Sequence, residues 1–198
     1  MADAHFNTMS GERGELDCGV DDRADPPGLG AVGSAGVSVW VEDATGRLGA
    51  AVAERLRVRG TRAVEHLGLI GEVGVRVVGD AEMASAHERY LGTAGTTDVI
   101  TFDLTDQLDP SRGLVLEADL LVCLDEAERQ AKVRGIEVEL ELLLYVIHGV
   151  LHCAGHDDHE EAEAGEMHVR EDEILSALGL GPVYARPPRG AAASARTV

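Results

Sequence analysis

Four histidines and two aspartates fall within twelve residues of this chain, from His148 to His159. Two of these histidines, His148 and His152, are four residues apart and follow an apolar run, Leu140 to Ile147, that predicts a buried helix. Residues four apart on a helix project from the same face, so both imidazoles can bind one metal ion. The pattern therefore predicts half of a metal site on a buried helix.

The turn after this helix can supply a third ligand. Gly155 is typical of a helix end, and the chain then continues through His156, Asp157, Asp158 and His159. Three protein ligands with a fourth position for water are typical of catalytic rather than structural zinc. The alternative interpretation is that the histidines are partly buried helix residues and that the acidic turn is a solvated loop.

Two familiar kinds of zinc protein are disfavoured. A zincin peptidase has a glutamate directly after its first histidine as general base, and this chain has Gly149 there. A structural zinc finger requires paired cysteines, whereas Cys18, Cys123 and Cys153 lie far apart and form no CxxC pair. The cysteines are typical of small core or surface residues in a reducing compartment.

The stretch HGVLHCAGHDDH, followed by acidic residues and Met167, resembles the signature of the YbeY family, bacterial rRNA maturation factors described as metal-dependent endoribonucleases. The family pattern has its third histidine at the position of Asp158, and this chain has a histidine one residue later. A one-residue insertion in the turn would make His159 the third ligand. Asp158 and His156 are the alternatives, since carboxylate is also a zinc ligand.

The resemblance extends over most of the expected core. Residues 74–78 are similar to the second strand of the family, and residues 97–102 to its TDVLSF-type strand. Residues 117–122 are similar to its GDIVIS-type strand, with Glu-Ala where glycine is usual before the aspartate. The order and spacing of these segments ahead of the histidines support the resemblance.

Four further residues are candidates for contacts around the metal or the substrate. Asp98 and Asp157 can accept the second ring N–H of a histidine ligand, or can be ordinary turn and capping residues. Many family members carry an arginine in a Tyr-Arg-Gly segment that is thought to act in the reaction or in RNA contact, and this chain reads Tyr90-Leu91-Gly92. Arg76 or Arg89 can substitute for that arginine, or can be ordinary surface residues.

The pattern of apolar residues predicts an α+β (mixed α/β) fold, a small mixed β-sheet of about four strands packed with about five helices. Strands are expected at 37–41, 73–78, 98–104 and 116–123, and helices at 47–67, 81–90, 125–134, 137–154 and 160–178. The short connection between the last two strands predicts an antiparallel pair. The first helix is expected to be interrupted near Gly60.

The composition predicts one folded domain, residues 37–180, between a disordered extension, residues 1–36, and a flexible tail, residues 181–198. The chain has no run of eighteen apolar residues, and its first residues lack a basic start and an apolar core. We therefore expect a cytoplasmic protein without a transmembrane span or a secretory signal.

Acidic residues outnumber basic ones by 36 to 17, with a formal net charge of −19. This balance argues against a protein held to nucleic acid by a basic patch. The densest basic stretch, Arg55, Arg57, Arg59 and Arg62, is the candidate face for phosphate contact, or else pairs with Glu54 and Glu65. The acidic residues of the last helix, 160–173, are expected to face solvent or a basic ribosomal protein.

The resemblance implies a single-strand-specific endoribonuclease for rRNA processing and ribosome quality control. Its catalytic residues and ligands for one Zn²⁺ would be His148, His152 and His159, with zinc activating water or polarising the phosphate. Nickel or copper would bind such a site at least as well in vitro. The expected partners are ribosomal RNA or a ribosomal subunit, and ribosomal proteins at the acidic surface, with no membrane and no DNA. The alternatives are a ribosome-associated assembly factor with a structural metal and little nuclease activity, and a metallohydrolase with another substrate.

Overall fold

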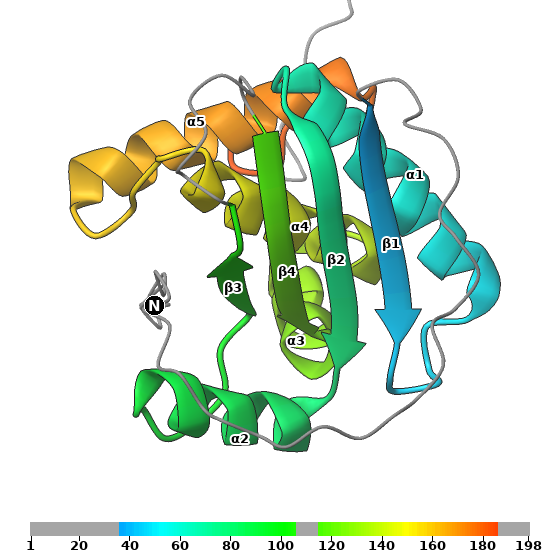
Figure 1. The fold of residues 1–198 in the computed structure, drawn as a ribbon, viewed down its shortest axis with the longest axis vertical. Helices are drawn as coiled ribbons and strands as arrows, with labels where there is room; N and C mark the ends of the chain where they lie inside the picture. Colours follow the sequence, from blue (N-terminus) through cyan, green and yellow to red (C-terminus); the bar gives the residue numbers. More distant parts are fainter. Residues whose placement is uncertain (1–35, 106–114, 186–198) are drawn as a thin grey trace, which may run out of the picture.

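The computed structural model describes residues 36–105 and 115–185, and these contain one mixed β-sheet. The strands are β1 (Val37–Asp43), β2 (Ile70–Val78), β3 (Val99–Asp103) and β4 (Val115–Cys123). They lie in the order β1-β2-β4-β3 (Figure 1). Strands β1, β2 and β4 are parallel, and the edge strand β3 is antiparallel to β4, as the short connection predicted.

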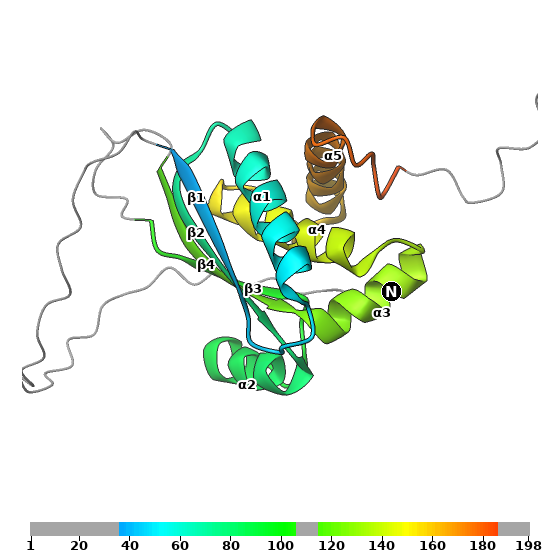
Figure 2. The same ribbon diagram turned by 90° about the vertical axis from the view of Figure 1, so that its right-hand side faces the viewer.

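Five helices accompany this sheet in the described residues, and most of them lie on one of its faces. They are α1 (Ala50–His66), α2 (Asp80–Leu91), α3 (Leu124–Arg134), α4 (Val138–Cys153) and α5 (Glu161–Ala177). Helices α1 and α4 pack on the same face, α5 lies beyond α4, and α2 covers only one end of the opposite face (Figure 2). The predicted fold class, a mixed sheet of about four strands with about five helices, is confirmed.

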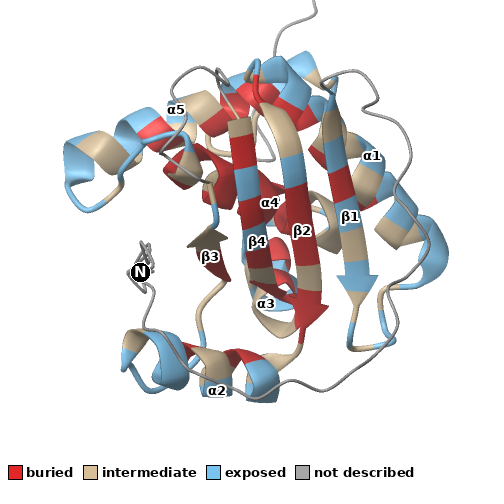
Figure 3. Ribbon diagram, viewed as in Figure 1, coloured by how far each residue is buried: buried red, intermediate tan, exposed pale blue. Residues whose placement is uncertain are grey.

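Helix α4 lies at the centre of the core (Figure 3). Every residue from Glu141 to Ile147 is buried, because α4 packs between the sheet and the helices α1, α3 and α5. A helix that is apolar on all sides requires such surroundings. None of the helices between residues 36 and 185, the gap at 106–114 aside, is long and apolar enough to cross a membrane.

Helix α1 continues without a break through Gly60, so the predicted interruption there is wrong. Gly60 is buried against Val39 and Val146, and Leu56 and Ala63 on the same helix are also buried. The packing of these residues outweighs the cost of about 1 kcal/mol for glycine in a helix.

The packed chain continues past the expected domain boundary at residue 180. The backbone N–H groups of Val183, Tyr184 and Ala185 donate hydrogen bonds of 2.6–3.1 Å to the carboxylate of Asp172. The ring of Tyr184 stacks on His168, with centroids 3.8 Å apart. The first five residues of the expected flexible tail are therefore held by α5. The rest of that tail, and the expected disordered extension except Gly36, lie outside the described residues.

Candidate metal centre

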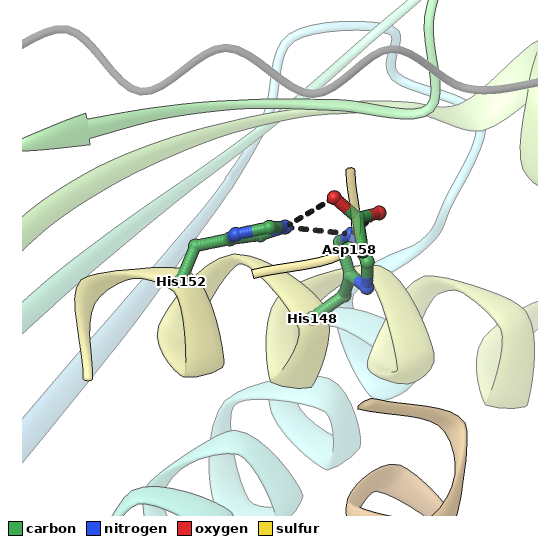
Figure 4. Close-up of side chains that lie close together, drawn as sticks. All are labelled: His148, His152 and Asp158. Carbon is green, nitrogen blue, oxygen red and sulfur yellow. Dashed lines mark hydrogen bonds and ion pairs between the residues drawn. The ribbon is translucent and has the colours of Figure 1, made fainter. Parts of the chain in front are cut away.

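The second half of α4 brings the two predicted histidine ligands together with Asp158, from the turn between α4 and α5 (Figure 4). The Nε2 atoms of His148 and His152 are 3.0 Å apart. The Asp158 carboxylate oxygens lie 3.6 Å from Nε2 of His148 and 3.7 Å from Nε2 of His152. Two imidazole nitrogens and a carboxylate oxygen thus converge, with the three ligand atoms within 4.8 Å of one another.

The residue between the histidines explains how close α4 lies to the sheet. A Cβ at Gly149 would lie 2.8 Å from Thr101 Oγ1 on β3 and 2.8 Å from Leu120 Cδ2 on β4. Position 149 therefore faces the sheet and not the metal centre. This orientation is the structural reason why a zincin-type glutamate has no place in this helix.

Each histidine is oriented through its other ring nitrogen. Nδ1 of His148 lies 2.7 Å from Oε1 of Glu171 on α5, and Nδ1 of His152 lies 3.0 Å from the carbonyl oxygen of His156. Both partners are acceptors, so each Nδ1 carries a proton and donates, and in a neutral imidazole Nε2 then presents a lone pair. This arrangement suits two imidazoles that bind a metal through Nε2.

Glu171 was missed in the sequence, where it was grouped with acidic residues that were expected to face solvent. That expectation is wrong for Glu171 and Asp172, which are 0% and 8% exposed. Glu171 lies on the same face of α5 as the buried Met167, Ile174 and Leu175, at spacings of three and four residues. A carboxylate inside this apolar stripe was the signal that could have identified it.

The two carboxylates that were predicted to orient the histidines have other hydrogen-bond donors. Asp98 accepts hydrogen bonds from Thr97 Oγ1 and from the N–H of Val99, and it acts on His148 through its charge. Asp157 accepts from the N–H of Asp158 and pairs with the ring of His159. Among the described residues, Glu171 and the carbonyl of His156 accept from His148 and His152, whereas Asp157 pairs with His159, the predicted third ligand.

The turn places Asp158, and not His159, against the histidine pair. The N–H of Gly155 donates to the carbonyl of His152, and the N–H of His156 donates to that of Leu151, with Gly155 at a φ of 90°. This is a glycine-capped helix end, and it turns the chain back toward α4. Nδ1 of His159 bonds to Asp157 instead, and the His159 side chain is 61% exposed. His156 contributes only its backbone carbonyl to the histidine pair.

The two histidines differ in their affinity for a proton. Burial and, after it, the charge of neighbouring His148 lower the pKa of His152 to about 3. Burial also lowers the pKa of His148, but the hydrogen bond and charge of Glu171 outweigh burial, so the net shift is upward. His152 is therefore held neutral, with its Nε2 lone pair free of a proton, whereas His148 gains a proton more readily.

All but one of the arginines that were candidates for substrate contact lie in ion pairs or on aromatic rings. Arg76 pairs with Glu42 at 2.5 Å and with Glu82 at 3.1 Å. The Arg89 guanidinium lies over the ring of Tyr90, 5.4 Å from its centroid. In the basic stretch on α1, Arg57 pairs with Glu54 as predicted, while Arg55 and Arg59 both pair with Glu139 on α4. The four arginines of this stretch thus face two carboxylates, and Arg62 has no ion pair within the described residues.

A family model described as Endoribonuclease YbeY matches residues 47–179, more than half of the chain. The chain belongs to the YbeY family. The YbeY match includes His148, His152, Asp158 and Glu171 and ends before the segment that packs against Asp172. The resemblance in the sequence is therefore confirmed.

Two relatives named for this family agree with the assignment. A protein of Methylibium petroleiphilum named Endoribonuclease YbeY is 39% identical over 114 residues, which are 58% of this chain and 72% of that protein. A protein of Verminephrobacter eiseniae with the same name is 33% identical over 147 residues, 72% of this chain and 92% of its own length. Among solved structures, a Thermotoga maritima protein is 23% identical, with a TM-score of 0.46 over 77% of this chain and 98% of its own.

Proposed function

We propose that this chain is a metal-dependent endoribonuclease that processes single-stranded segments of ribosomal RNA, with one zinc ion held by His148, His152 and Asp158. Membership of the YbeY family identifies the chain as an RNA-cleaving hydrolase. The observation that supports the metal is the convergence of two Nε2 atoms and one carboxylate, with both Nδ1 atoms bound to acceptors. Processing and quality control of ribosomal RNA are the proposed cellular role.

The donor set suits zinc. Two imidazoles and one carboxylate are a known set of protein ligands for catalytic zinc. Zinc would supply Lewis acidity for activating water and polarising a phosphoryl oxygen. A carboxylate in place of a third imidazole brings a negative charge to the centre, so we expect weaker Lewis acidity than at a three-histidine site.

The residues around the ligands hold them in place before a metal or substrate arrives. Glu171 fixes the ring of His148 from a fully buried position, and the glycine-capped turn fixes the ring of His152 through the carbonyl of His156. The Asp158 side chain is 16% exposed, so the centre is accessible to solvent on the side of the turn. Water and an RNA phosphate can approach from that side.

A second function is favoured by two observations. The chain has a formal charge of −19, and it has Leu91 where many family members have an arginine. Both features suit a ribosome-associated assembly factor in which the metal is structural and nuclease activity is slight. Exposed carboxylates at the start of α5, such as Glu161 and Glu166, would then contact basic ribosomal proteins.

Elemental analysis of matched turn variants tests the metal assignment. We expect about one zinc per chain in the wild type and in His159→Ala, and loss of zinc in Asp158→Ala, because only Asp158 faces both histidines. Loss of zinc in His159→Ala with retention in Asp158→Ala would instead support a site of three histidines, with His159 as the third ligand. No metal in the wild type, purified without chelator, would contradict a metal centre.

Cleavage of single-stranded RNA by the same proteins separates the two functions. For an enzyme, activity follows zinc content and the folded structure survives the loss of zinc. For an assembly factor, Asp158→Ala lowers the thermal unfolding temperature and the wild type cleaves no faster than the variant.

A further inference from the structure

A pocket of about 390 Å³ lies on the face of the sheet opposite α1 and α4. Trp40, Gly74, Asp119 and Phe102 follow one another in register across β1, β2, β4 and β3, and all four line this pocket. Tyr90, at the end of α2, lies beside Phe102, with ring centroids 5.0 Å apart and planes at 80°. The pocket is thus a row of aromatic rings with a carboxylate between them.

Gly74 allows two of these side chains to approach the sheet closely. A Cβ at this position would lie 2.3 Å from Cζ2 of Trp40 and 2.3 Å from Oδ1 of Asp119. The indole and the carboxylate therefore meet above the backbone of β2, where any larger residue would separate them. The pocket therefore depends on the absence of a side chain at position 74.

The aromatic rings of the pocket are accessible. Trp40 is 46% exposed and Tyr90 is 39% exposed, and with Leu104 they are three of the six exposed large apolar side chains among the described residues. Exposed rings on a sheet are the usual surface on which the bases of single-stranded RNA stack. Since every base has a π-face, the rings alone would bind any base.

The polar groups of the pocket narrow the choice of base. Asp119 makes no side-chain hydrogen bond or ion pair with another described residue, and a carboxylate only accepts hydrogen bonds. Guanine presents two adjacent N–H donors on its Watson–Crick edge, which match the two oxygens of a carboxylate. Uracil offers one donor there, flanked by two carbonyl oxygens that the carboxylate would repel.

The cations near the pocket differ in their availability for phosphate. Arg76 is neutralised by Glu42 and Glu82. Arg89 makes no ion pair within the described residues and lies over the ring of Tyr90. A phosphate next to a base stacked in the pocket would therefore meet Arg89 rather than Arg76.

Strand β3 connects this pocket to the metal centre. Phe102 faces the pocket, and the adjacent Thr101 faces the sheet side of α4 at Gly149, the residue after His148. Because β3 is the edge strand, a chain can pass around it from one face of the sheet to the other. A single-stranded RNA that passes over this edge can therefore contact both.

We propose that this pocket binds a guanine base of single-stranded RNA, with Trp40 and Tyr90 stacking on the base and Asp119 accepting its N–H groups. The inference rests on the proposed function, since it assigns a base preference to the RNA that the metal centre would cleave. Stacking and hydrogen bonding in the pocket select the segment, and the metal centre acts on a neighbouring phosphate.

Trp40 is the only tryptophan of the chain, so its fluorescence reports on the pocket directly. We expect GMP to quench this fluorescence at lower concentration than AMP, CMP or UMP. Asp119→Asn keeps the size of the side chain, and we expect it to weaken GMP binding about tenfold and to remove the preference, as loss of a paired base contact does. Gly74→Ala should abolish quenching, with circular dichroism confirming that the sheet is intact.

The metal-centre variant Asp158→Ala separates this inference from the proposed function. We expect it to lose RNA cleavage and to show the same quenching by GMP as the wild type. Quenching without cleavage in the wild type would support the guanine-binding pocket and contradict the proposed nuclease activity. Absence of quenching by all four nucleotides would contradict base binding in the pocket, even in a protein that cleaves RNA. An unchanged guanine preference in Asp119→Asn would contradict the role of Asp119 in selecting guanine.

Discussion

The two faces of the sheet at strand β3 hold their polar side chains in different states. On the α4 face, His148 and His152 each have one ring nitrogen bound to an acceptor, and Asp158 approaches the other nitrogens. On the opposite face, Asp119 lies among exposed aromatic rings without a side-chain partner in the described residues. The first face is organised before a ligand arrives, as chemistry requires, and the second presents groups for a ligand to engage.

Removal of a histidine ligand should have the largest effect. We expect His152→Ala to lower single-stranded RNA cleavage more than about 100-fold, since even residues that only orient a ligand contribute 10–100-fold. His152 is buried, so thermal unfolding measured in parallel must show that the variant is still folded at the assay temperature. Full cleavage by this variant would contradict the metal centre.

Substitution of Gly149 tests whether close packing of α4 on β3 sets the geometry of the centre. We expect Gly149→Ala to destabilise the protein by about 1–3 kcal/mol, because its Cβ would lie 2.8 Å from Thr101 and Leu120. Gly165→Ala on α5 is the control, since its Cβ meets nothing within 4 Å. We expect this variant to raise the free energy of unfolding by up to about 1 kcal/mol, because alanine favours a helix more than glycine does. Urea denaturation of both variants measures the difference, and equal midpoints would refute the packing argument.

The orienting carboxylate should have a smaller effect than a ligand. We expect Glu171→Gln to lower zinc affinity about tenfold, because the amide still accepts from His148 but lacks the negative charge. Competition with a chromogenic chelator measures this affinity. Glu173→Gln, two residues away and exposed, pairs only with Arg170 and should leave zinc affinity unchanged. An equal loss in both variants would indicate a general effect of charge and not a specific contact.

The smallest expected effect concerns the cation beside the pocket. We expect Arg89→Ala to weaken binding of a guanine-containing oligonucleotide two- to threefold and to reduce the slope of log affinity against log salt by about 0.7, the value for one phosphate contact. Arg57→Ala is the control, because Arg57 is already paired with Glu54. Fluorescence anisotropy of a labelled oligonucleotide over a range of salt concentrations gives the slope for each variant. Identical slopes for the two variants would contradict a phosphate contact by Arg89.

Much of the fold was predictable because it rests on local patterns. The strands and helices were expected within a few residues of their observed bounds, since apolar residues repeat every second residue in strands and every third or fourth in helices. The antiparallel pairing of β3 and β4 followed from their short connection. The break near Gly60 was predicted wrongly, because tertiary packing of α1 against β1 and α4 outweighs the local preference of glycine.

The sequence by itself determined the pairing of His148 with His152, because a spacing of four residues places two side chains on one face of any helix. It also determined the family, through motifs that occur in order along the chain. The approach of Asp158, the contact between Glu171 and His148 and the row from Trp40 to Phe102 were decided only by the tertiary structure. Each of these depends on how a turn closes or on the register between distant strands, and neither is encoded in the spacing of neighbouring residues.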